Sequence, residues 1–317
     1  MIRLGVDIGG TNIKIGLLKD EGRIIEKKEF PFSHDGYKSV FSQIEKEIRT
    51  LLDQEGFALG QVQSIGLAIP GSIDEKKGII THAYNLDFYD VPAVGQMQKA
   101  FPDTPIFLAN DANAAALAEF YSGVFKGYRT AVLLTIGTGV GGGIICDGKM
   151  FNGGQNNGVE LGHMMLKYGG IQCSCGNYGC VESYCTATWI ADQGKKLIKE
   201  KKDSVVTSRG KGKPENVDAK LVIDAAREGD LQAMEIFETF VDNLSAAITS
   251  INALLDPEII AIGGGVSGSG DILFESLRRK VKEKSFFKVD YKVEPAHLGN
   301  DAGIVGAAML YKNKETL

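Results

Sequence analysis

Two stretches of this chain run from a short apolar strand pattern through a glycine-rich turn directly into a second strand pattern. The first stretch spans residues 2–18 with its turn at 7–12, and the second spans residues 131–146 with its turn at 137–143. Glycine lets a backbone bend tightly and approach a ligand closely, so that its N–H groups can bind an anion. The second half of the chain opens much as the first half did, which suggests two domains built on one plan.

The length also favours two domains, because 317 residues exceed the roughly 250 to 300 at which a single core usually stops growing. We expect a small α/β domain in residues 1–111 plus 302–317 and a large α/β domain in residues 112–301. A cleft between two domains is a natural site for a small ligand.

The charge of the chain and the length of its apolar runs limit its partners and its compartment. The net charge is -5 and the isoelectric point is near 5.5, which argues against a general affinity for nucleic acid or anionic membranes. The chain opens directly into its first strand pattern and has no run of 18 apolar residues. We therefore expect a cytoplasmic protein that acts on small molecules.

Apolar spacing predicts the remaining elements. Strands are expected over residues 2–8, 13–18, 24–30, 64–69, 106–109, 131–136, 142–146 and 259–262. Helices are expected over residues 40–52, 112–120, 230–255, 271–282 and 303–311. The polar residues 203–218 are expected to form a solvated loop.

The first glycine turn has two interpretations. Asp7 at the end of its strand can hold a hydrated Mg²⁺, and the rest of the turn can cradle a phosphate through backbone N–H groups and a hydroxyl. The phosphate-binding residues would be Gly9, Gly10, Thr11 and Asn12. The alternative is a hairpin turn that is rich in glycine for steric reasons alone.

The second turn contains the letters GxGxxG at Gly137, Gly139 and Gly142. A dinucleotide-binding fingerprint requires a helix after the turn, whereas residues 144–146 continue as a strand. The sequence therefore predicts a second phosphate cradle at Gly137, Thr138 and Gly139.

A third cluster of glycines follows the strand at residues 259–262. Its side-chain-free backbone can accommodate an adenine ring or ribose, and an ordinary connection from strand to helix is the alternative. The residues concerned are Gly263, Gly264, Gly265 and Val266.

These motifs resemble the ROK family of sugar kinases and related repressors, a branch of the group that shares the actin and hexokinase ATPase fold. The most specific part is ExGH at residues 160–163, followed by CxCGxxGC at residues 173–180. The resemblance implies an α/β, two-domain actin-like ATPase (ribonuclease H-like) fold with an interdomain active-site cleft and a zinc-binding loop. It also implies a homodimer.

The ExGH and cysteine motifs supply one imidazole and three thiolates, a tetrahedral set suited to Zn²⁺. The four ligands would be His163, Cys173, Cys175 and Cys180. Four protein ligands leave no open position for water, so we expect a structural metal. A redox role for the cysteines is the alternative, and Cys146 and Cys185 are expected to be packed thiols.

The resemblance implies that Glu160, His163 and Glu182 contact sugar hydroxyls, whereas solvated surface charge is the alternative for the two glutamates. It places Asn110 on the sugar side as well, and Gly71 could let the sugar approach the backbone. Asn85 also resembles a sugar-side position of the family.

Asp111 lies between a strand and a helix, where its carboxylate can accept the proton of a sugar hydroxyl that attacks the γ-phosphate of ATP. The alternative is a helix N-cap. The resemblance favours the general base.

We therefore expect an ATP-dependent hexokinase of the EC 2.7.1 class that phosphorylates the 6-hydroxyl of a hexose, with glucose as the default. The alternatives are an N-acetylmannosamine or N-acetylglucosamine kinase and a non-catalytic sugar sensor. A repressor is not expected, because the first strand begins at Ile2 and the chain is acidic. The cofactors would be ATP, Mg²⁺ and structural Zn²⁺.

Overall fold

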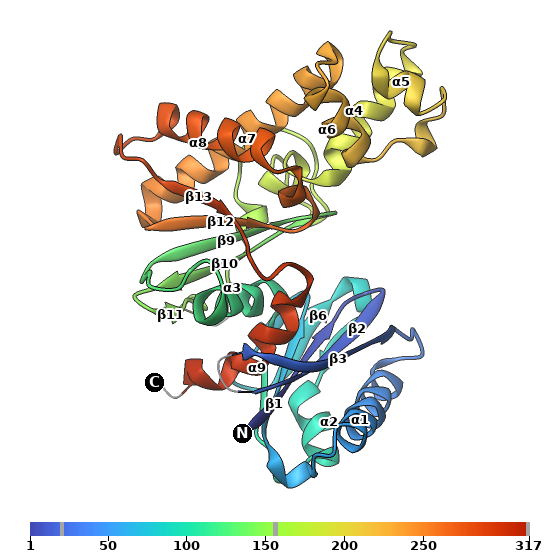
Figure 1. The fold of residues 1–317 in the computed structure, drawn as a ribbon, viewed down its shortest axis with the longest axis vertical. Coiled ribbons are helices and arrows are strands. Elements are labelled where there is room, and N and C mark those ends of the chain that lie inside the picture. The colour runs from blue at the N-terminus through green and yellow to red at the C-terminus, as the bar shows by residue number, and fades with distance from the viewer. Residues whose placement is uncertain (20–21, 155–157, 315–317) are drawn as a thin grey trace. The chain divides into compact units, whose positions relative to one another are not determined.

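A computed structural model describes residues 1–19, 22–154 and 158–314 (Figure 1). Its first five-stranded sheet has the order β3-β2-β1-β4-β8. The strands are β1 (Ile2–Ile8), β2 (Asn12–Leu18), β3 (Ile24–Pro31), β4 (Val62–Ile69) and β8 (Ile106–Asn110). Strands β1, β2 and β3 pair antiparallel, as their short connections predict, and β4 runs parallel to both β1 and β8.

The second five-stranded sheet has the order β11-β10-β9-β12-β13. Its strands are β9 (Ala131–Ile136), β10 (Val140–Cys146), β11 (Lys149–Met150), β12 (Ile259–Gly263) and β13 (Lys292–Pro295). Numbered along the chain, both sheets have the order 3-2-1-4-5, and in both the fourth strand runs parallel to the first and the fifth. The predicted common plan of the two halves is confirmed.

The α-helices are α1 (Tyr37–Gln54), α2 (Ala93–Ala100), α3 (Asp111–Ser122), α4 (Ala187–Lys199), α5 (Val205–Arg209), α6 (Ala219–Arg227), α7 (Leu231–Leu255), α8 (Asp271–Lys284) and α9 (Ala302–Lys314). Short 3₁₀ helices are η2 (Leu59–Gln61), η3 (Tyr84–Leu86), η4 (Leu161–His163), η5 (Val181–Ser183), η6 (Pro214–Asn216), η7 (Gly265–Ser269) and η8 (Gly299–Asp301). Within the described residues, no helix is both long and apolar enough to cross a membrane.

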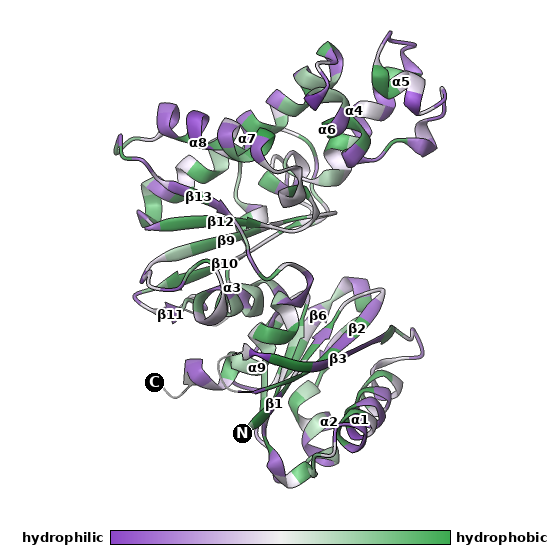
Figure 2. Ribbon diagram, viewed as in Figure 1, coloured by the Kyte–Doolittle hydropathy of each residue, from purple (hydrophilic) through white to green (hydrophobic). Residues whose placement is uncertain are grey.

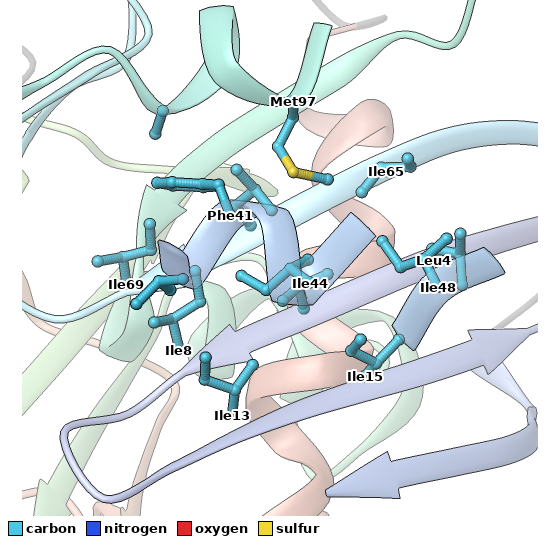
Figure 3. Packing of buried hydrophobic residues seen from close by; sticks show 14 of the residues in the cluster. Leu4, Ile8, Ile13, Ile15, Phe41, Ile44, Ile48, Ile65, Ile69 and Met97 are labelled. Carbon is cyan, nitrogen blue, oxygen red and sulfur yellow. The ribbon is translucent and has the colours of Figure 1, made fainter. Parts of the chain in front are cut away.

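One hydrophobic core lies under the first sheet. Helix α1 buries Ile44, Ile48 and Leu51, which recur at the three- and four-residue spacing of one helix face. Figure 3 shows Ile44 and Ile48 among side chains of β1 and β2. In the second sheet, β9 and β12 are buried along nearly their whole length and are mostly hydrophobic (Figure 2). Such continuous apolar runs are typical of parallel strands covered on both faces.

The residues group into two compact units. Unit 1 comprises Met1–Arg129, Gly143–Val159 and His297–Leu317, and unit 2 comprises Thr130–Gly142 and Glu160–Ala296. The division expected from the sequence lay at residues 111/112 and 301/302, so it assigned α3 to the large domain. In the structure α3 belongs to unit 1, because it packs closely on α9. A side chain at Gly306 of α9 would overlap the backbone of Ala114 in α3.

Some elements were not predicted. Residues 72–91 form a small antiparallel sheet of β5 (Ser72–Asp74), β6 (Ile79–Ala83) and β7 (Phe88–Val91). The expected loop at residues 203–218 contains α5 and η6, so that prediction is wrong in part. Ser204 caps α5 by accepting a hydrogen bond from the Val206 N–H (3.1 Å), which a reading based on charge alone overlooks.

Candidate active site and metal centre

Asp111 occupies the first position of α3, directly after strand β8. The preceding residue caps the helix, since Oδ1 of Asn110 accepts hydrogen bonds from the N–H groups of Ala112 (2.9 Å) and Asn113 (3.3 Å). The N-cap is thus Asn110 and not Asp111. The Asp111 carboxylate accepts a hydrogen bond from the Ala112 N–H (2.8 Å).

Asn110 also fixes the neighbouring turn. Its Nδ2 donates a hydrogen bond to the carbonyl oxygen of Gly71 (3.0 Å). Gly71 has φ +98°, and a side chain there would overlap the carbonyl of His82, so only glycine fits. One amide side chain therefore ties the start of α3 to the turn after β4.

Asp7 lies near Asp111 in unit 1. Burial raises the pKa of Asp7 to about 6, and repulsion from Asp111 contributes to the rise, while Lys14 opposes it. Burial likewise raises the pKa of Asp111. The Asp7 carboxylate lies against Gly303 in the first turn of α9, where a side chain would not fit. Two carboxyl groups in such surroundings are suited to holding a hydrated cation and to accepting a proton.

The first glycine turn is closed by a hydrogen bond from the Gly9 N–H to the carbonyl of Asn12 (3.0 Å). The Asn12 side chain is held in place by Glu29, whose Oε1 accepts from its Nδ2 (2.6 Å). Gly10 packs against Asn85, whose carbonyl would lie 3.3 Å from a Cβ at that glycine. Unit 1 thus brings together the predicted residues Asp7, Gly9, Gly10, Thr11, Asn12, Gly71, Asn85, Asn110 and Asp111.

Unit 2 places the other two glycine clusters side by side. Strands β9 and β12 are parallel neighbours with Gly263 paired to Thr135, so the turns that follow them leave the same edge of the sheet. Gly264 has φ +79°, and a side chain there would overlap the backbone of Ile136. In α/β sheets, ligands bind at the carboxyl ends of parallel strands. The turns after β9 and β12 lie at such ends.

Helix α4 supports the second turn. The Ala187 N–H donates to the carbonyl of Gly137 (2.8 Å), and Oγ1 of Thr188 donates to the carbonyl of Thr138 (3.4 Å). After the turn the chain continues as β10, which confirms that no dinucleotide-binding helix follows. Beside the turn lies a cavity of about 380 Å³, whose lining includes Thr138, Ser174, Glu182, Trp189, Gln193 and Lys196.

The four predicted zinc ligands converge. One ligand atom from each of His163, Cys173, Cys175 and Cys180 lies within 4.8 Å of all the others. The edges of a tetrahedral zinc site are about 3.8 Å between two sulfurs and about 3.6 Å between sulfur and nitrogen, given the usual bond lengths. The Cys175 and Cys180 sulfurs are 3.7 Å apart, and Cys173 Sγ lies 3.6 Å from His163 Nδ1. These residues therefore fit zinc.

The geometry distinguishes the two histidine nitrogens. Because Nδ1 of His163 faces the cysteine sulfurs, Nε2 is the nitrogen left to bind another group. Glu160 is exposed and lies one turn earlier, where its carbonyl accepts the His163 N–H (3.0 Å). Cys185 is buried, as predicted, and burial raises its pKa to about 12. Cys146 is exposed, so its prediction as a packed thiol is wrong; it ends β10 just before a turn.

Three supporting residues were not found from the sequence. Glu29 holds Asn12 from the neighbouring strand, Gly303 makes room for Asp7, and Thr188 bonds to the second turn. The helix predicted over residues 303–311 already began at Gly303, which is a poor helix former, and that was a usable signal of close packing. The other two contacts depend on strand register and helix placement.

Comparison with known proteins agrees with this description. A model of the ROK family matches residues 3–314. A glucokinase from Thermotoga maritima is 37% identical over 315 residues, which are 98% of this chain and 97% of the glucokinase.

Two solved structures extend the comparison. The first, a ROK family glucokinase from Streptomyces griseus in complex with glucose and AMPPNP, has a TM-score of 0.81 and 29% identity, over 98% of this chain and 99% of that chain. The second, a putative N-acetylmannosamine kinase from Listeria monocytogenes, has a TM-score of 0.81 and 26% identity, over 99% and 100%. The fold is the actin-like ATPase fold that the motifs predict.

Proposed function

Because the chain belongs to the ROK family, we propose that it is a sugar kinase that transfers the γ-phosphoryl group of ATP to the 6-hydroxyl of glucose, with Asp111 as general base. The observation that carries the proposal is the placement of Asp111. Its carboxylate begins α3 beside Asp7, and the cap that the helix needs is supplied by Asn110. Asp111 is therefore available for proton transfer.

The reaction uses Asp111 for one proton transfer. Its carboxylate takes the proton of the 6-hydroxyl as that oxygen bonds to the γ-phosphorus, and the bond from phosphorus to the bridging oxygen breaks, so that ADP leaves with the electron pair. Burial raises the pKa of Asp111, which makes its carboxylate a stronger base than that of an exposed aspartate. Asn110 orients this carboxylate because it fixes the start of α3.

The glycine turns bind the nucleotide in this proposal. Backbone N–H groups of the turns that follow β1 and β9 donate hydrogen bonds to phosphate oxygens, and the turn after β12 accommodates adenine and ribose. Asp7 would hold the hydration shell of Mg²⁺, and the ion would supply positive charge to the phosphates when bound. The nucleotide residues are Asp7, Gly9, Gly10, Thr11, Asn12, Gly137, Thr138, Gly139, Gly263, Gly264, Gly265 and Val266.

The sugar hydroxyls are bound by carboxylates, amides and an imidazole, whose lone pairs and N–H groups match vicinal hydroxyls. For His163 the nitrogen concerned is Nε2, because Nδ1 belongs to the zinc set. The sugar residues are Gly71, Asn85, Asn110, Asp111, Glu160, His163 and Glu182. Zinc is structural, and we further propose a cytoplasmic homodimer.

A sugar panel tests the proposal. ADP release is measured with glucose, mannose, N-acetylmannosamine and N-acetylglucosamine, and glucose is expected to give the highest kcat/KM. A preference for N-acetylmannosamine would favour the second candidate, which the likeness to the Listeria protein supports. If no sugar stimulated ADP release, the chain would be a sensor instead of a kinase.

A further inference from the structure

Glu182 connects the zinc loop, which carries the ligand residues between 163 and 180, to the second glycine turn. It lies two residues after Cys180, in η5. Its Oε2 accepts a hydrogen bond from the N–H of Val140 (3.0 Å), which is the first residue of β10 and directly follows the turn residues Gly137, Thr138 and Gly139. Its Oε1 accepts from Oγ of Ser174 (3.2 Å), which lies between two of the zinc ligands. One carboxylate thus joins two loops that are separate in the sequence.

The turn is shaped to receive this carboxylate. A Cβ on Gly139 would lie 2.7 Å from Oε2 of Glu182, which is too close for a real contact. The backbone at Gly139 does not have the left-handed φ that excludes other residues, and the atoms that crowd this Cβ position belong to Glu182 alone. A Cβ at position 139 would therefore displace the Glu182 carboxylate and not the backbone of the turn.

We propose that Glu182 is a positioning residue that fixes the phosphate-binding turn through Val140, so that the zinc loop supports nucleotide binding. The proposal rests on the assignment of this turn to ATP. It is compatible with a sugar contact, because Oε2 has two lone pairs and its bond to Val140 uses one of them. The proposal predicts that nucleotide affinity depends on Glu182, a residue that the proposed function assigns to sugar binding.

A double-mutant cycle tests the contact. ADP affinity is measured by calorimetry, without sugar, for zinc-loaded native protein, Gly139→Ala, Glu182→Ala and the double variant. Each single variant loses the hydrogen bond from the Val140 N–H to the Glu182 carboxylate. Given the free energy of a hydrogen bond to a charged group, each should bind ADP about 10- to 100-fold more weakly than native protein. The double variant should bind no more weakly than Glu182→Ala, because the space that Gly139→Ala needs is then free. Additive losses would overturn the proposal.

Conservative variants separate positioning from a general loss of structure. Glu182→Gln keeps an oxygen for the Val140 N–H, so its ADP affinity should stay within about threefold of native, and Gly139→Ala should remain harmful in that background. A loss as large as that of Glu182→Ala would contradict the proposal. Ser183→Ala changes the neighbouring residue and should leave ADP affinity unchanged; a matching loss there would also contradict it.

The outcome is independent of the sugar assay. A protein that shows this coupling in ADP binding but phosphorylates no sugar would keep the inference and overturn the proposed function. A protein that phosphorylates glucose but shows additive losses would do the reverse. Native protein that binds no ADP would overturn both.

Discussion

Asp7 and Asp111 are chemically alike, and their positions give them different tasks. Asp7 ends β1 and lies against the start of α9, whereas Asp111 begins α3. Each is raised in pKa chiefly by burial, and the charge of Asp111 adds to the rise at Asp7. A site that holds two such groups together is less stable than it would be with neutral residues, as functional sites often are.

The pKa of Asp7 predicts how stability depends on pH. In the unfolded chain its pKa is near 3.8, and in the fold it is about 6, so the folded state binds the proton more tightly. This contribution is fully present below about pH 3.8 and is lost as the pH rises through 6. Above that, ionised Asp7 costs roughly 3 kcal/mol. Asp7→Asn should therefore raise stability in denaturant unfolding at pH 8 and much less at pH 4.

Asp74→Asn is the matched control, because Asp74 is partnered by Lys77 and its pKa is lowered instead of raised. This control should show no stabilisation at pH 8. Both variants are measured without Mg²⁺ and nucleotide, since a bound cation would favour ionised Asp7. Equal stability of native protein and Asp7→Asn at pH 8 would contradict the account of this residue.

At the scale of elements, α3 depends on its cap. Asn110→Ala removes the bonds to the first turn of α3 and should cost about 0.5–2 kcal/mol of stability. It should also raise the KM for glucose and lower kcat, because the carboxylate of Asp111 is no longer fixed. Denaturant unfolding and steady-state kinetics measure the two effects.

Asp230 provides the comparison, since it caps α7 in the same way, by accepting from the Ala233 N–H (2.8 Å). Asp230→Ala should lower stability and leave the kinetic constants unchanged. Equal kinetic effects of the two variants would show that loss of stability alone, and not the cap of α3, explains the result.

The zinc loop makes a prediction of its own. Metal analysis of purified protein should find stoichiometric zinc, and chelation should lower the melting temperature, because the four ligands hold residues 163–180 together. Cys175→Ser should lose the metal, whereas Cys146→Ser, outside the set, should keep it. Absence of zinc, with a melting temperature that chelators do not change, would show that the site has another role.

Most elements could be predicted because their apolar residues follow a regular period. Strands β1 and β9 have their predicted bounds, and α7 ends at Leu255 as expected. The small sheet of β5, β6 and β7 could not be predicted in the same way. Its strands are three to five residues long, and exposed residues such as Tyr89 in β7 weaken their apolar pattern.

The whole molecule repeats one sheet order, and the sequence showed this through its two strand-turn-strand openings. The limits of the compact units could not be predicted from the sequence, because they depend on packing between helices that are distant in the chain. The close approach of Gly306 in α9 to Ala114 in α3 joins residues separated by most of the chain. No local pattern of apolar residues reports such a contact.

Only part of the candidate site could be predicted from the sequence. Glycine turns and the cysteine motif could be located from residue type and spacing, because backbone shape and metal ligation need particular residues. Two contacts could not be predicted in this way, namely the hydrogen bond between Val140 and Glu182 and the one between Asn12 and Glu29. Both depend on how loops and strands are placed in the fold.

The central claim concerns Asp111, and one variant tests it most directly. Asp111→Asn is compared with native protein for formation of glucose 6-phosphate from ATP and, separately, for glucose binding by calorimetry. The account predicts that kcat falls by at least about 10²–10⁴-fold, the usual worth of a general base, while glucose affinity changes little. Phosphorylation at a near-native rate by this variant would contradict the assignment of Asp111 as the base.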